Sequence, residues 1–209
     1  MRTRPILFIA PMVRALLDGS KTQTRRPFNA RTLSLMQAAG LAGLVSHFTT
    51  EATLASSDLS YVRDFCPYGK PGDLLWVREA FSGPHCMEAG EGRAAVPPKK
   101  WAHESALWYW ADGNPSKGDW TRPRPSIHMP RWASRITLEI VSVRVERLQD
   151  ISEADAEAEG IDFLRHTPDV DETLTAKQLY DALWESINGA GSWAENPWVW
   201  CVEFKAVKP

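Results

Sequence analysis

Residues 135–147 read RITLEIVSVRVER, and this stretch decides the fold class of the chain. Apolar and polar residues alternate along it, which is the pattern of a β-strand with one face against a core. The alternation changes phase at the doublet Ile140–Val141, which predicts a β-bulge or a bend. A long bent strand of this kind is typical of a small closed β-barrel.

The segments around this strand complete an α+β pattern. Apolar runs and alternation predict strands over residues 5–10, 21–26, 74–81, 107–111 and 198–207. Apolar stripes at helical spacing, bounded by capping residues, predict helices over 11–18, 30–45, 152–160 and 175–187. Segments without such a pattern predict loops over 46–64, 82–105 and 112–134. With no convincing linker, we expect residues 1–209 to form a single domain with loop insertions.

The charges are segregated along the chain, although its 24 basic and 26 acidic residues leave a net charge of only −2. Residues 1–36 carry seven Lys and Arg against one acid, and residues 113–135 carry five against one. Residues 148–172 carry nine acids against one Arg. The balance argues against a protein that coats nucleic acid. A basic face that meets phosphate is one interpretation of the segregation, and pairing between the segments is the other.

Metal and cofactor chemistry find little support in the sequence. The three cysteines form no CxxC pair, and the five histidines lack metal-ligand spacing. Neither GxGxxG, GxxxxGK[ST] nor GxSxG occurs. We therefore expect no metal and no cofactor. An odd number of cysteines without a pairing pattern, and no long apolar run, favour a reduced, cytoplasmic protein without a membrane span.

Three residues are weak candidates for acid–base chemistry on their own. A lysine partly buried beside Arg25 and Arg26 has a lowered pKa, so Lys21 is a possible base for the hydroxyl of Thr24. Glu159 ends an acidic helix just before Gly160, a position that is unfavourable for a carboxylate unless a cation lies opposite. The alternative is a surface lysine, a strand threonine and one more solvated acid.

Aromatic and basic residues are interleaved in the second half of the chain. The run Trp108–Trp110 precedes several arginines, Arg131 among them, which is the composition of a platform for single strands or flipped bases. Trp108 and Trp110 share one face of a strand, so packing in a core is the alternative interpretation. We also include Trp76, Arg78 and Glu79, from the strand over 74–81, among the candidate binding residues.

Four blocks of sequence, in order, resemble the ASCH domain family of the PUA-like superfamily. They are KTQTRR at 21–26, PGDLLWV at 71–77, LQDISEADAEAEG at 148–160 and PWVWCVEF at 197–204. The first is similar to the family's Lys-Thr-x-Thr-x-Arg signature, and the pattern is closest to ASCH proteins of phages and prophages. The resemblance implies a PUA-like small mixed β-barrel with flanking helices and a nucleobase-sized cleft. The residues beyond the family's blocks lie mainly at about 28–66 and 82–130, as insertions.

The resemblance also implies an activity. In small bacterial members that hydrolyse N4-acetylcytidine, the signature lysine is the base, the second threonine the nucleophile and a helix acid the proton donor. These roles fall on Lys21, Thr24 and Glu159, with Arg25 and Arg26 expected at the rim of the cleft. A non-catalytic reader of a modified or flipped base is the alternative, and a ribonuclease comes third. The expected partner is a modified nucleoside or a nucleic acid, RNA rather than DNA.

Overall fold

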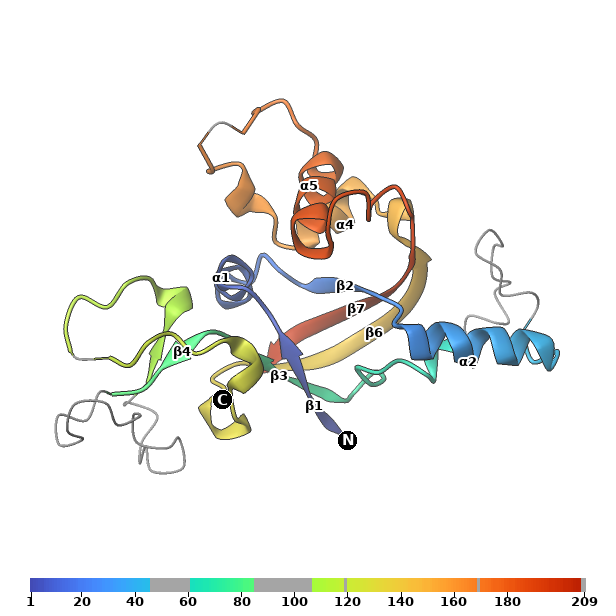
Figure 1. Cartoon of the computed structure of the whole chain (residues 1–209), viewed down its shortest axis with the longest axis horizontal. Helices are drawn as coiled ribbons and strands as arrows, with labels where there is room; N and C mark the ends of the chain where they lie inside the picture. Colours follow the sequence, from blue (N-terminus) through green and yellow to red (C-terminus); the bar gives the residue numbers. More distant parts are fainter. Residues whose placement is uncertain (46–60, 85–106, 119, 169, 208–209) are drawn as a thin grey trace.

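The main element of the structure is a five-stranded mixed sheet in the order β1-β3-β6-β7-β2 (Figure 1). This computed structural model describes residues 1–45, 61–84, 107–118, 120–168 and 170–207. The strands are β1 (Thr3–Leu7), β2 (Gln23–Pro27), β3 (Leu74–Arg78), β6 (Thr137–Arg147) and β7 (Trp198–Val207). β1 pairs in parallel with β3, and the other neighbours are antiparallel. The chain therefore has the α+β class that its sequence predicts.

The predicted irregularity in the long strand is confirmed. The register between β6 and β7 shifts between Ile140 and Ser142, and the intervening Val141 is half exposed while Ile140 is buried. The extra residue breaks the strict alternation and bends the strand. β6 and β7 curve together through the middle of the molecule, as Figure 1 shows.

The prediction of a closed barrel is wrong, because the sheet stays open between its first and last strands. β1 and β2 lie at opposite ends of the strand order. β1 ends at Leu7, and helix α1 (Ala10–Asp18) begins almost at once with Pro11 in its first turn. The chain thus leaves the sheet before a ladder with β2 can form, since proline favours the helix start and donates no backbone hydrogen bond. A side chain reaches across instead: Arg26 Nη2 donates to the Leu7 carbonyl at 2.5 Å.

Three further helices begin at side-chain caps. They are α2 (Ala30–Leu41), α4 (Glu153–Ala158) and α5 (Ala176–Asn188). Ser152 accepts a hydrogen bond from the Asp155 backbone at the start of α4, and Thr175 forms a capping box with Gln178 at the start of α5. α4 and α5 lie next to each other beyond the sheet in Figure 1, and α2 extends from the far end of β2.

Part of the predicted insertion 82–130 forms a small annex beside the main sheet. β4 (Phe81–Ser82) and β5 (Trp108–Tyr109) pair there, and short 3₁₀ turns follow at Trp110–Asp112, Ser126–His128 and Arg131–Ala133. The predicted strand over 74–81 is therefore split into β3 and β4. Apolar residues of β3 and of the annex form a second buried cluster, which consists of Trp76, Phe81, Leu107, Met129 and Ala133. Residues 46–60 and 85–106, which fall in two of the predicted loops, lie outside the described residues.

Candidate active site between the edge strands

A cavity of about 280 Å³ lies where the sheet is left open, between the end of β1 and the strand β2. Residues Leu7–Ile9 line one side and Thr24–Pro27 the other. Helix α5 adds an apolar wall that includes Tyr180, Leu183 and Trp184. Lys21, Thr24 and Glu159, the three residues expected to act together, all line this one cavity.

Lys21 and Glu159 form a buried ion pair. Lys21 Nζ lies 2.9 Å from Glu159 Oε2 and 2.6 Å from the Glu159 main-chain carbonyl, and both side chains are at most 3% exposed. The second contact satisfies a carbonyl at the C-terminal end of α4, where a cation is electrostatically favoured. Glu159 thus occupies its unfavourable position at a helix C-terminus because a cation lies opposite, as the sequence suggested.

Close backbone packing explains why these two residues meet. The Thr22 backbone donates to the Ala158 carbonyl at 2.9 Å, which ties the start of the β2 segment to the end of α4. Gly160 follows with a φ of +75°, and a Cβ added there would lie 2.8 Å from the Cβ atoms of both Ala15 and Lys21. Only glycine combines this left-handed backbone with so close an approach. Gly160 therefore sets the distance between α4 and Lys21.

The environment of Lys21 favours loss of its proton. Burial lowers the pKa of Lys21, because the ammonium loses its hydration, and the Glu159 carboxylate opposes this effect. The charges of Arg26 and Arg25 lower the pKa further. A lysine with a lowered pKa is more easily converted to the neutral amine that can act as a general base.

Arg25, which was expected at the rim of the cavity, lines it from a buried position. Its side chain is fully buried and lies among three carboxylates: 2.9 Å from Glu146, 3.1 Å from Asp155 and 3.4 Å from Glu159. Gln23 reinforces this arrangement, since its Nε2 donates to Asp155. Because three carboxylates bind the Arg25 guanidinium, it is not free to bind a ligand phosphate. Its contact with Glu159 helps to orient that carboxylate.

Arg26 does lie at the mouth, as predicted. Besides its contact with the Leu7 carbonyl, its guanidinium lies 5.2 Å from the centre of the Phe8 ring. Lys21 Nζ lies 5.5 Å from the same ring. Phe8 therefore contacts two cations and gives the cavity an aromatic surface.

Two functional candidates on α5 were missed by sequence reasoning. Tyr180 and Trp184 line the cavity, although their spacing of four residues indicates only a core-facing stripe. The indole Nε1 of Trp184 is buried with no hydrogen-bond partner in the described part of the chain. Burial raises the pKa of Tyr180 well above its ordinary value, and the Glu159 charge adds to this, so its hydroxyl stays protonated. The Tyr180 hydroxyl can offer a hydrogen-bond donor to a ligand, and the Trp184 ring adds apolar surface to the cavity wall.

The remaining predicted binding residues lie away from this cavity, in and around the annex. Trp76 is buried, and the guanidinium groups of Arg78 and Arg131 lie 4.6 and 5.8 Å from its ring centre. Glu79 is buried and binds Arg135, at 2.9 and 3.0 Å from its two carboxylate oxygens. The predicted site residues therefore fall into two groups, one that lines the cavity and one in and around the annex.

Trp108 and Trp110 are also engaged in contacts within the annex. Trp110 Nε1 donates to Ser82 Oγ, and Trp108 Nε1 donates to the Gly113 carbonyl. The Trp108 ring lies 5.8 Å from that of Trp120. Both residues are half-buried in the annex, and neither lines the cavity.

Among the described residues, no group of three or more His, Cys, Asp and Glu side chains is arranged to hold a metal ion. No described helix has both the length and the apolar character that crossing a bilayer requires. No protein-family model matches the chain, and no curated protein or solved structure is significantly similar to it.

Proposed function

We propose that this chain is an ASCH-type amidohydrolase with a PUA-like core, which hydrolyses the N-acetyl amide of N4-acetylcytidine or a related N-acylated cytosine compound. The observation that carries the proposal is that the buried Lys21–Glu159 ion pair and Thr24 line a single cavity. A base, a hydroxyl and a proton donor at one site are the groups that amide cleavage needs.

The size and lining of the cavity suit a small planar ligand. Its volume of about 280 Å³ lies at the lower end of the range for small-molecule sites. The aromatic residues Phe8, Tyr180 and Trp184 provide faces and edges against which a base can pack. The protonated Tyr180 hydroxyl offers a donor for a carbonyl oxygen of the ligand.

Each proposed catalytic group has one task. Neutral Lys21 accepts the Thr24 hydroxyl proton as Thr24 Oγ1 attacks the acetyl carbonyl. The Lys21 ammonium passes this proton to the Glu159 carboxylate, which lies 2.9 Å away. Glu159 delivers it to the departing N4 amine as the C–N bond breaks, so an acetyl-threonine ester remains and Lys21 is neutral again. Water then hydrolyses this ester, with Lys21 again as base, and releases acetate.

A non-catalytic reader of a modified base is the second candidate, and one observation favours it. Lys21 donates to two oxygens of Glu159, and the Glu159 carboxylate opposes the lowering of the Lys21 pKa by burial, which favours the protonated ammonium. In that form the pair is a neutral, preorganised wall that can recognise a base through hydrogen bonds. The two functions differ in whether the lysine gives up its proton.

Acetate release by the wild-type protein decides between them. The substrates are N4-acetylcytidine and an oligoribonucleotide that contains one N4-acetylcytidine. Release from either supports the amidohydrolase, with cytidine or the deacetylated oligonucleotide as the second product. Binding of either compound without acetate release would overturn the amidohydrolase in favour of the reader.

A further inference from the structure

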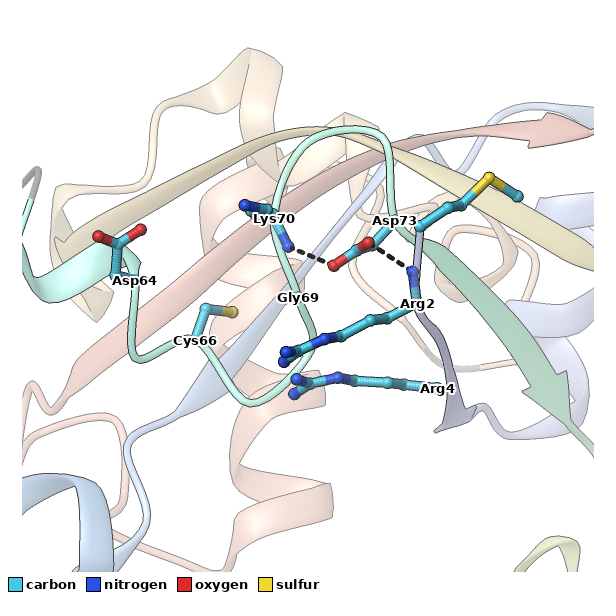
Figure 2. A pocket seen from close by; sticks show the side chains of 8 residues that line it. Arg2, Arg4, Asp64, Cys66, Gly69, Lys70 and Asp73 are labelled. Atoms are coloured by element: carbon cyan, nitrogen blue, oxygen red, sulfur yellow. Dashed lines mark hydrogen bonds between the residues drawn. The ribbon is translucent and has the colours of Figure 1, made fainter.

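A second and larger cavity, of about 510 Å³, lies at the start of β1, whereas the candidate active site lies at the end of this strand (Figure 2). Three of its lining residues are cationic, and none of them takes part in the proposed hydrolysis. The lining consists of Met1, Arg2, Arg4, Asp64, Cys66, Gly69, Lys70 and Asp73.

The buried carboxylate of Asp73 binds the backbones of two of the cationic residues, Arg2 and Lys70. Asp73 Oδ1 accepts a hydrogen bond from the Arg2 backbone at 2.7 Å, and Oδ2 accepts one from the Lys70 backbone at 3.3 Å. Figure 2 shows both bonds meeting at this side chain. The carboxylate is thereby occupied by main-chain donors, and the charged ends of Arg2 and Lys70 remain available to the cavity.

The turn that contains Gly69 and Lys70 packs closely against the Asp73 side chain. Gly69 has a φ of +122°, and a Cβ added there would lie 2.9 Å from Asp73 Oδ2. A larger residue would push the turn away from the carboxylate, so the wall of the cavity depends on this glycine. The guanidinium of Arg4 donates to the Pro67 carbonyl and fixes the other side of the same turn.

Cationic side chains outnumber acidic ones in the cavity lining, with Arg2, Arg4 and Lys70 against Asp64 and Asp73. Arg2 directly precedes β1 and Arg4 lies within it, two residues further on, and their side chains point the same way in Figure 2. In the part of the chain that the structure describes, the Arg2 guanidinium and the Lys70 ammonium have no hydrogen bond or ion pair. The Asp73 carboxylate attracts Lys70 and offsets part of the repulsion among the three cations, and an anionic ligand offsets more of it.

We propose that this cavity binds a phosphate group, and that the ligand is the backbone of a single-stranded nucleic acid. Guanidinium groups match the geometry of phosphate oxygens, and Lys70 adds a mobile positive charge. A neighbouring hollow of about 350 Å³ shares Asp64 and Lys70 with the cavity and adds Arg63. Two adjoining basic hollows suit a chain with successive phosphates better than a single ion. Asp64, the exposed acid of the lining, lies in Figure 2 on the far side of the cavity from Asp73.

The experiment measures binding of a fluorescent oligouridylate of about 12 nucleotides by anisotropy, over a series of salt concentrations. The test variant is Arg2→Gln/Lys70→Gln, because both side chains are exposed and their backbone bonds to Asp73 persist. The charge-matched control is Arg31→Gln/Lys117→Gln, which removes two exposed cations elsewhere. Thermal melting checks that each variant is folded.

We expect the test variant to bind at least about tenfold more weakly at low salt, and the control to bind within about twofold of wild type. The slope of log K against log salt is expected to fall by about 1.4, because each lost phosphate contact contributes about 0.7 for a single strand. Uridine monophosphate and inorganic phosphate are then added as competitors. If either compound competes at millimolar concentration, the result supports a phosphate-binding cavity. It overturns the assignment of single-stranded nucleic acid as the ligand in favour of a small phosphate.

Two results would overturn the proposal: no binding of the oligonucleotide or of the small phosphates by wild type, or an equal loss in the test variant and the control. The readout is binding, not acetate release. Failure of the wild type to hydrolyse N4-acetylcytidine would therefore overturn the proposed function and leave this cavity unaffected.

Discussion

The Lys21 ammonium donates to both the side chain and the main-chain carbonyl of Glu159, a residue 138 positions further along the chain. The two contacts combine a structural and a chemical role. The carbonyl contact ends α4 with a favourable charge, and the carboxylate contact places an acid beside a lysine whose pKa is lowered by burial. The predictions below separate these roles.

Replacement of Gly160 by Ala is expected to destabilise the protein by about 2–5 kcal/mol. The left-handed backbone contributes about 1–2 kcal/mol, and the clash of the new Cβ with Ala15 and Lys21 adds about 1–3 kcal/mol. Urea denaturation measures the free energy of unfolding. Gly19→Ala is the matched control, because Gly19 has a similar φ of +84° but open space around it. Equal losses in the two variants would show that α4 does not pack closely on Lys21.

The rate of acetate release is expected to rise with pH. Burial lowers the pKa of Lys21 from its ordinary value of 10.5, and only the neutral amine accepts the Thr24 proton. As the pH rises through this lowered pKa, the neutral fraction grows and kcat/KM should rise to a plateau below the ordinary value. A profile measured from about pH 6 to about pH 10 tests this sign.

The control for the pH profile is Lys21→Arg, which keeps a positive charge beside Glu159 but does not deprotonate. It should be inactive at every pH, as should Lys21→Ala. An Arg variant with wild-type activity, or a rate that falls as the pH rises, would contradict the role of Lys21 as a base.

Substitutions of Thr24 test for a nucleophile. Thr24→Ser keeps the hydroxyl and should retain measurable hydrolysis, whereas Thr24→Val keeps the shape without the hydroxyl and should retain none. Thr22→Val, an exposed neighbour in the same segment, is the control and should behave like wild type. Hydrolysis by the Thr24→Val variant at the wild-type rate would exclude the acetyl-threonine intermediate.

Glu159→Gln should lower kcat by about 10²–10⁴-fold and change KM much less, because the amide keeps the shape but does not transfer a proton. The substitution also leaves two buried cations with one acid fewer, so a loss of stability of several kcal/mol is expected beside the kinetic effect. Glu157→Gln, on the same helix but exposed and paired with Arg165, is the control. A rise in KM with unchanged kcat would instead indicate a binding role.

Local features of the fold were predictable because they depend on near neighbours in the chain. The bulge at Ile140–Val141 follows from the phase of an alternation, and the starts of α4 and α5 follow from capping at Ser152 and Thr175. The sequence placed Lys21 outside a helix and Glu159 at a helix end without any long-range information. Such signals act over about four residues, which is the range of helix and strand periodicity.

The ion pairs of Arg25 were not predictable from the sequence. A basic segment can face a phosphate or pair with acids, and the sequence left both possibilities open. The structure shows pairing for Arg25, with carboxylates that lie 121 to 134 positions away. Burial depends on which distant segments fold over a residue, and composition does not encode that choice.

The sequence by itself determined the α+β class, the order of the main strands and helices, and the residue types that amide chemistry requires. Tertiary structure alone decided that the sheet stays open, that a cavity fills the gap between β1 and β2, and that Tyr180 and Trp184 wall it. The physical reason is that strand pairing and cavity shape arise from contacts between segments far apart in the chain. Arg26 reaches the Leu7 carbonyl where a backbone ladder would otherwise close the barrel, and this side-chain bridge leaves the space beside Lys21 and Glu159.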